Sequence, residues 1–179
     1  MVVFTTLKDN IMSKKVCFIG HREIKVTDEL LKSLNEFIIH LIVDENVNYF
    51  LFGNKSQFDN LCYDIVSKLK EKYLDIKRVY VRNCYEFISD TYKKYLLEGY
   101  EETIYPEECK NSGKVSYVRR NQAMIDGSDF CIFYYDKNYL PPKRKNSRTD
   151  LLDYQPKSGT AVAYKYAIQK KKQIKNFYR

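Results

Sequence analysis

The chain has 179 residues, of which 44% are hydrophobic and 30% are charged. This length fits one domain of ordinary size, and the apolar content excludes a disordered chain. The 31 basic residues outnumber the 23 acidic ones, and the net charge of +8 favours an anionic partner without choosing among nucleic acid, free nucleotide and a merely soluble surface. No apolar run approaches the roughly 20 residues that a membrane-spanning helix needs, so no membrane partner is expected.

The start of the chain reads as a loose extension, residues 1–14, before a domain at residues 15–179. It carries no signal-peptide pattern, which predicts a cytoplasmic, reducing location. The five cysteines fall in no metal-ligand spacing and only two histidines accompany them, so we expect neither a metal nor a cofactor. Cys17 and Cys131 lie inside apolar runs and are expected to be small core residues.

Short apolar runs alternate with segments of helical spacing along the chain. The first strand is expected at 16–19, and a helix follows with Thr27 or Asp28 as its cap. Ser56 is the expected N-cap of the second helix and Gly127 the expected end of a later one. Further strands are expected at 49–52, 76–81, 130–135 and 173–177, with helices over 58–69, around 92–97, over 114–125 and from 159.

This alternation predicts an α/β protein with a single Rossmann-like domain. We expect an open, mostly parallel five-stranded sheet with helices on both faces. The middle of the chain, 83–112, is less regular. The last helix is expected to turn Ala163, Tyr166, Ala167 and Ile168 inward.

Polar residues follow the predicted strands. In open parallel sheets, ligands bind beyond the carboxyl ends of the strands, where the strand order reverses. Arg22 is suited to grip a phosphate through two hydrogen bonds, and Asp136 to accept hydrogen bonds from a ribose or base. Each residue also has a plain structural reading as a turn or cap residue, His21 and Asp136 included. The candidates at these exits are Gly20, His21, Arg22, Gly53, Asn54, Ser56, Arg82 and Asp136.

A second group of donors opens the last helix. The run Gln155-Pro156 leads into Lys157, Ser158, Gly159 and Thr160, which combine a full positive charge, two hydroxyls and a glycine at a helix N-terminus. Such a terminus favours a phosphate, although an ordinary serine cap gives the same pattern. On the preceding helix, Arg119 and Arg120 point roughly 100° apart, so one of them is expected to face the cleft, next to Asn121.

The residues of these loops resemble the SLOG superfamily. The resemblance rests on the run Val16 to Arg22, the Phe52-Gly53 turn with Ser56 and Phe58-Asp59, and the Ser158-Gly159-Thr160 loop. SLOG proteins are a Rossmann-like group that includes the DNA-processing Smf/DprA proteins and the LOG cytokinin-activating phosphoribohydrolases. The branch most like this chain consists of small stand-alone proteins with a Phe-x-Gly-His-Arg start, and the likeness spans about 15–176.

The resemblance implies a nucleotide-type ligand over the glycine-containing loops. Arg120-Asn121 looks like the Arg-Lys pair of LOG enzymes, and Arg120 would then match their catalytic arginine. Pro156 to Thr160 looks like the start of their glycine-rich motif. The chain departs from the pattern at Ala163, which occupies the position of the catalytic Glu, and alanine can neither stabilise an oxocarbenium-like centre nor activate water.

The first hypothesis is therefore a binding protein for a nucleotide or nucleotide-derived signal, such as an ADP-ribose-like molecule or a cyclic nucleotide. It would act as a sensor or sequestering protein. The second is a phosphoribohydrolase of nucleoside monophosphates with a carboxylate recruited from Glu86, Asp136 or Asp153. The third is single-stranded nucleic-acid binding through the basic cluster 143–145 and neighbouring tyrosines. The sequence leaves open a homodimer or larger homo-oligomer.

Overall fold

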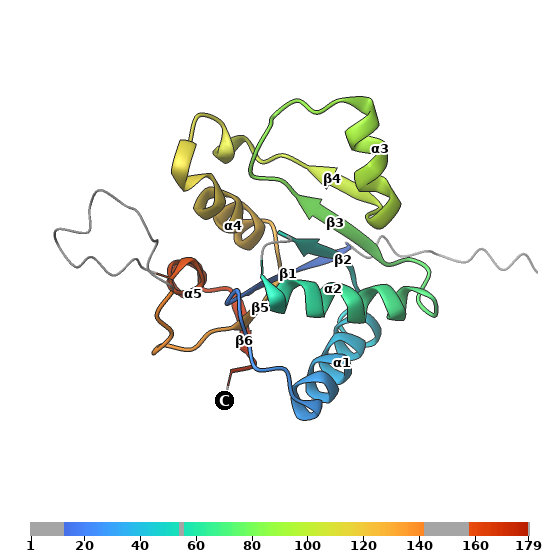
Figure 1. Cartoon of the computed structure of the whole chain (residues 1–179). Coiled ribbons are helices and arrows are strands. Elements are labelled where there is room, and N and C mark those ends of the chain that lie inside the picture. The colour runs from blue at the N-terminus through green and yellow to red at the C-terminus, as the bar shows by residue number, and fades with distance from the viewer. Residues whose placement is uncertain (1–12, 54–55, 142–157, 179) are drawn as a thin grey trace, which may run out of the picture.

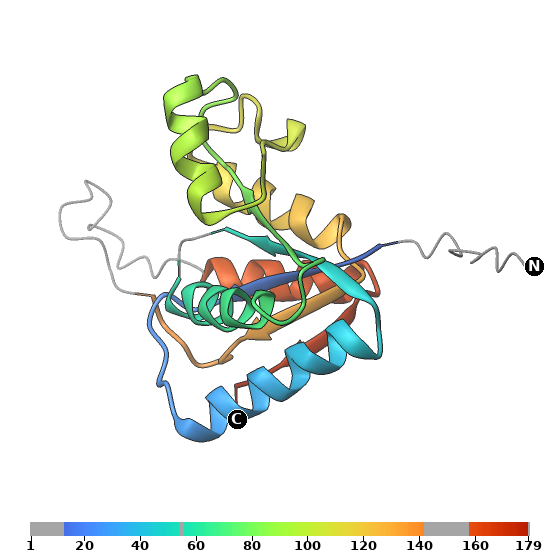
Figure 2. The same cartoon turned by 90° about the vertical axis from the view of Figure 1, so that its right-hand side faces the viewer.

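The computed structural model describes residues 13–53, 56–141 and 158–178, which form one sheet of six parallel strands flanked by helices (Figures 1 and 2). The spatial order of the strands is β4-β3-β2-β1-β5-β6. The fold class predicted from the sequence is thus confirmed. The strands are β1 (Lys14–Gly20), β2 (Val47–Phe52), β3 (Lys77–Val81), β4 (Glu102–Ile104), β5 (Phe130–Tyr134) and β6 (Gln173–Asn176).

Helices cover both faces of the sheet. One core layer packs α1 and α2 against the sheet, and the other packs α4 and α5 against the opposite face. In Figure 1, α3 lies beside the edge strand β4. The Tyr63 hydroxyl of α2 donates a 2.6 Å hydrogen bond to the carbonyl of Gly99, the last residue of α3. The helices are α1 (Asp28–Val43), α2 (Gln57–Lys70), α3 (Asp90–Gly99), α4 (Ser116–Asp126) and α5 (Gly159–Gln169), with single 3₁₀ turns at Glu107–Cys109 and Gly113–Val115.

The central strands read as continuous apolar runs because both of their faces are buried. Along β1, Val16 and Phe18 point into the layer of α1 and α2, whereas Cys17 and Ile19 point into the layer of α4 and α5. Cys17 lies beside Cys131 of β5 in the strand register, and both are fully buried. The prediction that these two cysteines are core residues is confirmed.

Side-chain caps start the helices where the sequence indicates. The Thr27 hydroxyl accepts from the Leu30 amide at 3.2 Å, and the Ser56 hydroxyl accepts from the Asp59 amide at 3.1 Å. Gly127 ends α4 as its C-cap. The expected inner face of α5 is only partly right: Ala163 and Ala167 are buried, but Ile168 is 55% exposed, and Thr160 is buried in the first turn.

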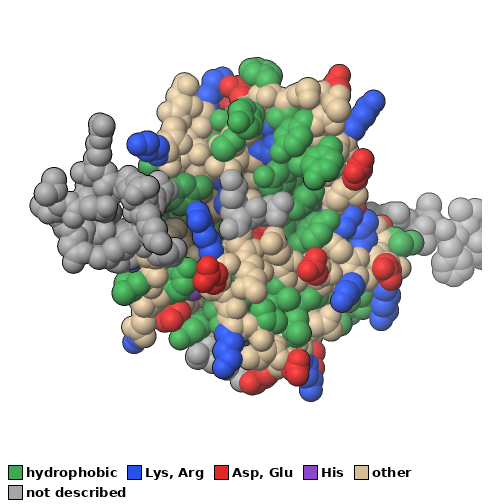
Figure 3. Space-filling model, viewed as in Figure 1, with side chains coloured by type: hydrophobic (Ala, Val, Ile, Leu, Met, Phe, Trp, Pro, Cys, Tyr) green, Lys and Arg blue, Asp and Glu red, His purple; other side chains and the backbone are tan. Residues whose placement is uncertain are grey.

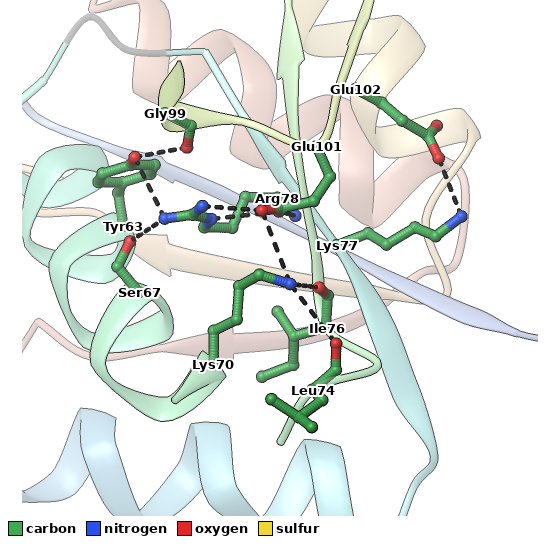
Figure 4. A network of polar contacts seen from close by, with 10 residues as sticks. All are labelled: Tyr63, Ser67, Lys70, Leu74, Ile76, Lys77, Arg78, Gly99, Glu101 and Glu102. Carbon is green, nitrogen blue, oxygen red and sulfur yellow. Dashed lines mark hydrogen bonds and ion pairs between the residues drawn. The ribbon is translucent and has the colours of Figure 1, made fainter. Parts of the chain in front are cut away.

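The prediction of five strands is wrong, because β4 adds a sixth beside β3. This strand has only three residues, none of them fully buried, so it leaves no apolar run to detect. It is held by side chains shown in Figure 4: the Arg78 guanidinium binds Glu101 next to β4, with its Nη2 at 2.8 Å from Oε1, and also donates to the Ser67 hydroxyl of α2.

The strand order reverses between β1 and β5. Strands β2, β3 and β4 extend the sheet from one side of β1, while β5 and β6 extend it from the other. A crevice at the carboxyl ends of β1 and β5 is where open parallel sheets bind ligands. Of the predicted extension 1–14, only residues 13 and 14 are described, and Lys14 begins β1. No helix within the described ranges is long and apolar enough to cross a membrane.

Candidate functional site

Buried polar side chains concentrate at the carboxyl end of the sheet. A buried polar group is informative because its burial costs free energy unless it finds a partner. Within the described parts of the chain, every buried polar or charged residue except Ser128 lies at or beside this end of the sheet: His21, Asp59, Arg82, Asn83, Arg120, Asn121, Ser158 and Thr160. Most of them belong to the candidates that the sequence indicates.

Arg120 lies over the exit of β2. Its side chain is only 5% exposed, and Nη1 donates a 2.8 Å hydrogen bond to the Gly53 carbonyl. Nε and Nη2 both donate to Asn121 Oδ1, at 3.2 and 2.9 Å. The neighbouring Arg119 is exposed and donates instead to Gln122 Oε1. Of the two arginines, Arg120 is therefore the one that turns into the molecule.

Asp59 joins this group from the opposite helical layer. Its Oδ1 accepts a 3.2 Å hydrogen bond from the Gly53 amide. Burial lowers the pKa of Arg120, and the nearby Asp59 carboxylate and Tyr80 act in the opposite direction by favouring the charged guanidinium. We call Gly53, Asp59, Tyr80, Arg120 and Asn121 the arginine cluster.

The sequence pointed to Asp59 only through the family resemblance and not as a site residue. The pattern from Ser56 to Asp59 is that of a helix N-terminus, and the Ser56 hydroxyl does accept from the Asp59 amide. The carboxylate itself, however, turns back to Gly53. Nothing in the spacing distinguishes this contact from an ordinary cap.

Arg82 and Asn83 follow β3 at the neighbouring exit. Arg82 is 9% exposed; its Nε donates to the Thr103 hydroxyl at 3.2 Å and its Nη1 to the Tyr85 carbonyl at 2.5 Å. Asn83 Nδ2 donates to the Ser116 hydroxyl at 3.1 Å, which ties this exit to the start of α4. Among the described residues, no carboxylate lies within ion-pair distance of Arg82.

His21 fills the point where the strand order reverses. Its Nε2 accepts a 2.9 Å hydrogen bond from the Asp136 amide after β5, which places the ring proton on Nδ1, 3.4 Å from the Ser158 hydroxyl. The Tyr139 ring stacks on it with centroids 3.9 Å apart. Burial lowers the pKa of His21 and so favours the neutral ring, although the backbone contact with Asp136 and the Asp136 carboxylate act in the opposite direction. We call His21, Asp136, Tyr139 and Ser158 the switch-point cluster.

Both ring nitrogens of His21 thus contact protein groups. The imidazole ties the exits of β1 and β5 to the N-terminus of α5, and it fixes the position of that helix end. Asp136 Oδ1 accepts from the Asn138 amide at 2.8 Å, so this side chain also organises its own loop. Ser158 is the N-cap of α5 and accepts from the Ala161 amide at 3.4 Å.

The remaining candidates have mixed surroundings. At Gly20 a Cβ atom would lie 2.4 Å from Cβ of Phe58, so this glycine permits α2 to pack closely on β1. Arg22 is exposed, and its carbonyl accepts from the Gln57 amide at 2.9 Å. Gly159 faces the Tyr117 ring. The candidates Asn54, Lys157 and Asp153 and the basic cluster 143–145 lie outside the described residues.

Two hollows elsewhere on the described surface are less suited to a single ligand class. One of about 810 Å³ lies between α1 and β6, and charges of both signs line it, such as Lys25, Glu36 and Lys175. The other, of about 550 Å³, lies at the amino end of the sheet around Asn48 and Tyr73. Neither brings together buried charged groups, as the carboxyl end does.

No protein-family model matches the chain, and no curated protein matches its sequence. The fold and the site define the class on their own: this is a Rossmann-like α/β protein with a buried, arginine-containing polar cluster at the carboxyl end of its sheet. In the described ranges, no group of three or more His, Cys, Asp or Glu side chains is arranged to hold a metal ion.

Proposed function

We propose that the protein binds a nucleotide or nucleotide-derived signalling ligand, of the ADP-ribose or cyclic-nucleotide type, at the carboxyl end of its sheet. The observation that carries the proposal is an imbalance of buried charge. Arg82 and Arg120 are buried at neighbouring strand exits, whereas Asp59 is the only buried carboxylate among the described residues. An anionic ligand would offset the remaining positive charge.

The N-terminus of α5 supports the same kind of ligand. A helix N-terminus carries partial positive charge that attracts phosphate, and the hydroxyls of the N-cap Ser158 and of Thr160 lie at this end of α5. His21 would act as a positioning residue, because it fixes this helix end against β1 and β5. The resemblance to SLOG proteins agrees with this assignment and forms part of the proposal.

Binding is favoured over glycosidic cleavage. Ala163, at the position that matches the catalytic Glu of LOG enzymes, packs in the core between α5 and the sheet. The carboxylates at this end of the sheet have structural contacts: Asp59 with Gly53, Asp136 with Asn138, and Glu86 with Lys110 at 2.9 Å. A sensor or a sequestering protein therefore fits these residues better than a hydrolase does.

Isothermal titration calorimetry with mononucleotides, NAD, ADP-ribose and cyclic nucleotides tests the proposal. At least one of them should bind at micromolar concentration, and the Arg120→Ala variant should lose that binding. Arg119→Ala is the matched control, because it removes the same side chain one residue earlier from an exposed position. Since Arg120 is buried and its variant can be unstable, Arg82→Gln provides a second and milder loss of positive charge.

Two results would contradict this function. No heat of binding from any member of the panel at millimolar concentration would remove the proposal altogether. Release of free base from a nucleoside monophosphate, lost in Arg120→Ala and kept in Arg119→Ala, would replace it with the phosphoribohydrolase alternative.

A further inference from the structure

The loop between β3 and α3 presents two aromatic side chains to solvent. Tyr85 is 77% exposed and Phe87 is 87% exposed. Singly exposed hydrophobic side chains are common, but exposed aromatic side chains that gather beside a polar site form the kind of patch that marks a contact surface. Both residues follow directly on Arg82 and Asn83, whose side chains are buried in the candidate site.

The backbone of this loop is held in a strained conformation. Tyr85 has φ of 59°, a left-handed value that is costly for a bulky residue. The Arg82 guanidinium maintains it by donating to the Tyr85 carbonyl at 2.5 Å, and Lys110 pairs with Glu86 at 2.9 Å on the other side of the turn. The Arg82 side chain therefore holds the backbone of this loop directly at Tyr85.

The loop is continuous with the arginine cluster. Tyr80 of the arginine cluster lies on β3, two residues before the buried Arg82, whose Nη1 donates to the Tyr85 carbonyl. The Tyr80 ring stacks on the ring of Tyr100, the C-cap residue of α3, with centroids 5.3 Å apart. An exposed aromatic surface thus begins at the edge of the buried polar site.

Helix α3 extends this surface. Tyr92 and Tyr95 are exposed and stack with ring centroids 6.2 Å apart. Figure 3 shows hydrophobic side chains gathered on the upper part of the molecule, where Figure 1 has α3, β3 and β4. We call Tyr85, Phe87, Tyr92 and Tyr95 the aromatic rim.

We propose that the aromatic rim is the base-recognition part of the site, and that Tyr85 and Phe87 stack on the planar base of a nucleotide whose phosphate lies against the arginines. This inference rests on the proposed function and assigns the base and the phosphate of the ligand to different residues. A planar base suits the rim because every nucleobase has a face that stacks on an aromatic ring. The binding energy would come from Tyr85 and Phe87 for the base, and from Arg82 and Arg120 for the phosphate.

The experiment compares probes with and without a base. Calorimetry is performed with AMP, ADP-ribose and ribose phosphate on the wild type and on Tyr85→Ala and Phe87→Ala. Each variant should bind AMP and ADP-ribose about tenfold more weakly, the size typical of one lost stacking contact. Affinity for ribose phosphate should stay unchanged. Phe87→Tyr should keep the affinity for AMP, whereas Phe87→Leu, which keeps apolar area without an aromatic face, should not.

Leu74→Ala is the control for removing an exposed apolar side chain, because Leu74 is 79% exposed at the opposite end of the sheet. If the wild type binds AMP and the rim variants bind it equally well, the base assignment is overturned while the proposed function stands. An equal loss for ribose phosphate, or a change only in oligomeric state by sedimentation, would also overturn it. A wild type that binds no probe would overturn both.

Discussion

The guanidinium group of Arg120 lies directly against Gly53, with a 2.8 Å hydrogen bond from Nη1 to the Gly53 carbonyl. Arg120 comes from α4 on one face of the sheet, and Gly53 leads into α2 on the other face. A Cβ atom at position 53 would lie 2.6 Å from Cζ of Arg120, so only glycine leaves room for this contact. The buried arginine and the glycine at the strand exit are therefore one structural unit.

Gly53→Ala should displace the Arg120 side chain and weaken both stability and ligand binding. Overpacking of a buried site of this kind costs about 1–3 kcal/mol of unfolding free energy, measurable by urea denaturation. The double variant Gly53→Ala with Arg120→Ala provides the control. It should be no less stable than Arg120→Ala alone, because the steric conflict is gone; additive losses would show that the two residues act separately.

Alanine substitutions at two other glycines should differ in their effect on stability, because one glycine contacts a buried side chain and the other an exposed one. Gly20→Ala should cost about 1–3 kcal/mol, because the new methyl group would meet Cβ of the fully buried Phe58 at 2.4 Å. Gly159→Ala should change stability little, since its nearest neighbour, the Tyr117 ring at 3.1 Å, is 42% exposed and can shift. Thermal unfolding of the two variants checks this, and equal shifts in melting temperature would contradict it.

Sequence reasoning predicted the fold class well because strands that are buried on both faces leave continuous apolar runs in the sequence, as in β1 and β5. It missed β4, whose residues Glu102–Ile104 show no such run and are positioned by pairing with β3 and by the Arg78–Glu101 contact. The prediction that Ile168 faces inward is wrong, since this side chain is 55% exposed. Four residues alone are too few to fix which face of a helix is buried.

The residues of the candidate site were expected at one end of the sheet for a topological reason. The carboxyl ends of parallel strands lie at one end of the sheet, so the residues that follow the strands are brought together regardless of the type or contacts of their side chains. Their orientations depend on tertiary partners that the spacing does not show. Arg82 contacts Thr103 of the unpredicted β4, and Asp59 turns away from its helix toward Gly53.

The Arg78–Glu101 pair should make the protein sensitive to acid. Burial raises the pKa of Glu101, but the hydrogen bonds from Arg78 outweigh it and the net pKa is lowered. A carboxylate whose pKa is lowered in the folded state stabilises the protein at pH values above the ordinary glutamate pKa. This stabilisation is lost as the pH falls through the folded-state pKa. Glu101→Gln should therefore cost about 1 kcal/mol at neutral pH, after allowance for its partial exposure, and progressively less below about pH 4.

Glu102→Gln is the control for this prediction, because the neighbouring Glu102 of β4 pairs with Lys77 of β3 in a more exposed position. It should destabilise less than Glu101→Gln at neutral pH. Urea unfolding of both variants between neutral and acidic pH makes the comparison. Losses of equal size at all pH values would mean that the Arg78 contact contributes nothing specific.

His21 should add a second pH dependence at a higher pH. Burial lowers its folded-state pKa below the ordinary value of about 6.5, and Nε2 must be unprotonated to accept from the Asp136 amide. As the pH falls, the imidazole of His21 is therefore protonated in the unfolded chain at a higher pH than in the folded protein. The stability that His21 contributes is fully present above about pH 6.5 and is lost as pH falls from there through the folded-state pKa.

His21→Gln removes this titration. An amide side chain keeps one acceptor for the Asp136 amide but does not titrate, so the variant should be less stable than the wild type at pH 8 and the difference should shrink toward pH 5. Urea unfolding at several pH values measures it, and NMR titration of the His21 ring gives the pKa directly. His40→Gln is the control, since His40 is exposed near the C-terminal end of α1, where its Nδ1 lies 2.6 Å from Asp44 Oδ2, and it does not belong to the switch-point cluster. A difference that grows on acidification would mean that His21 is protonated in the folded protein.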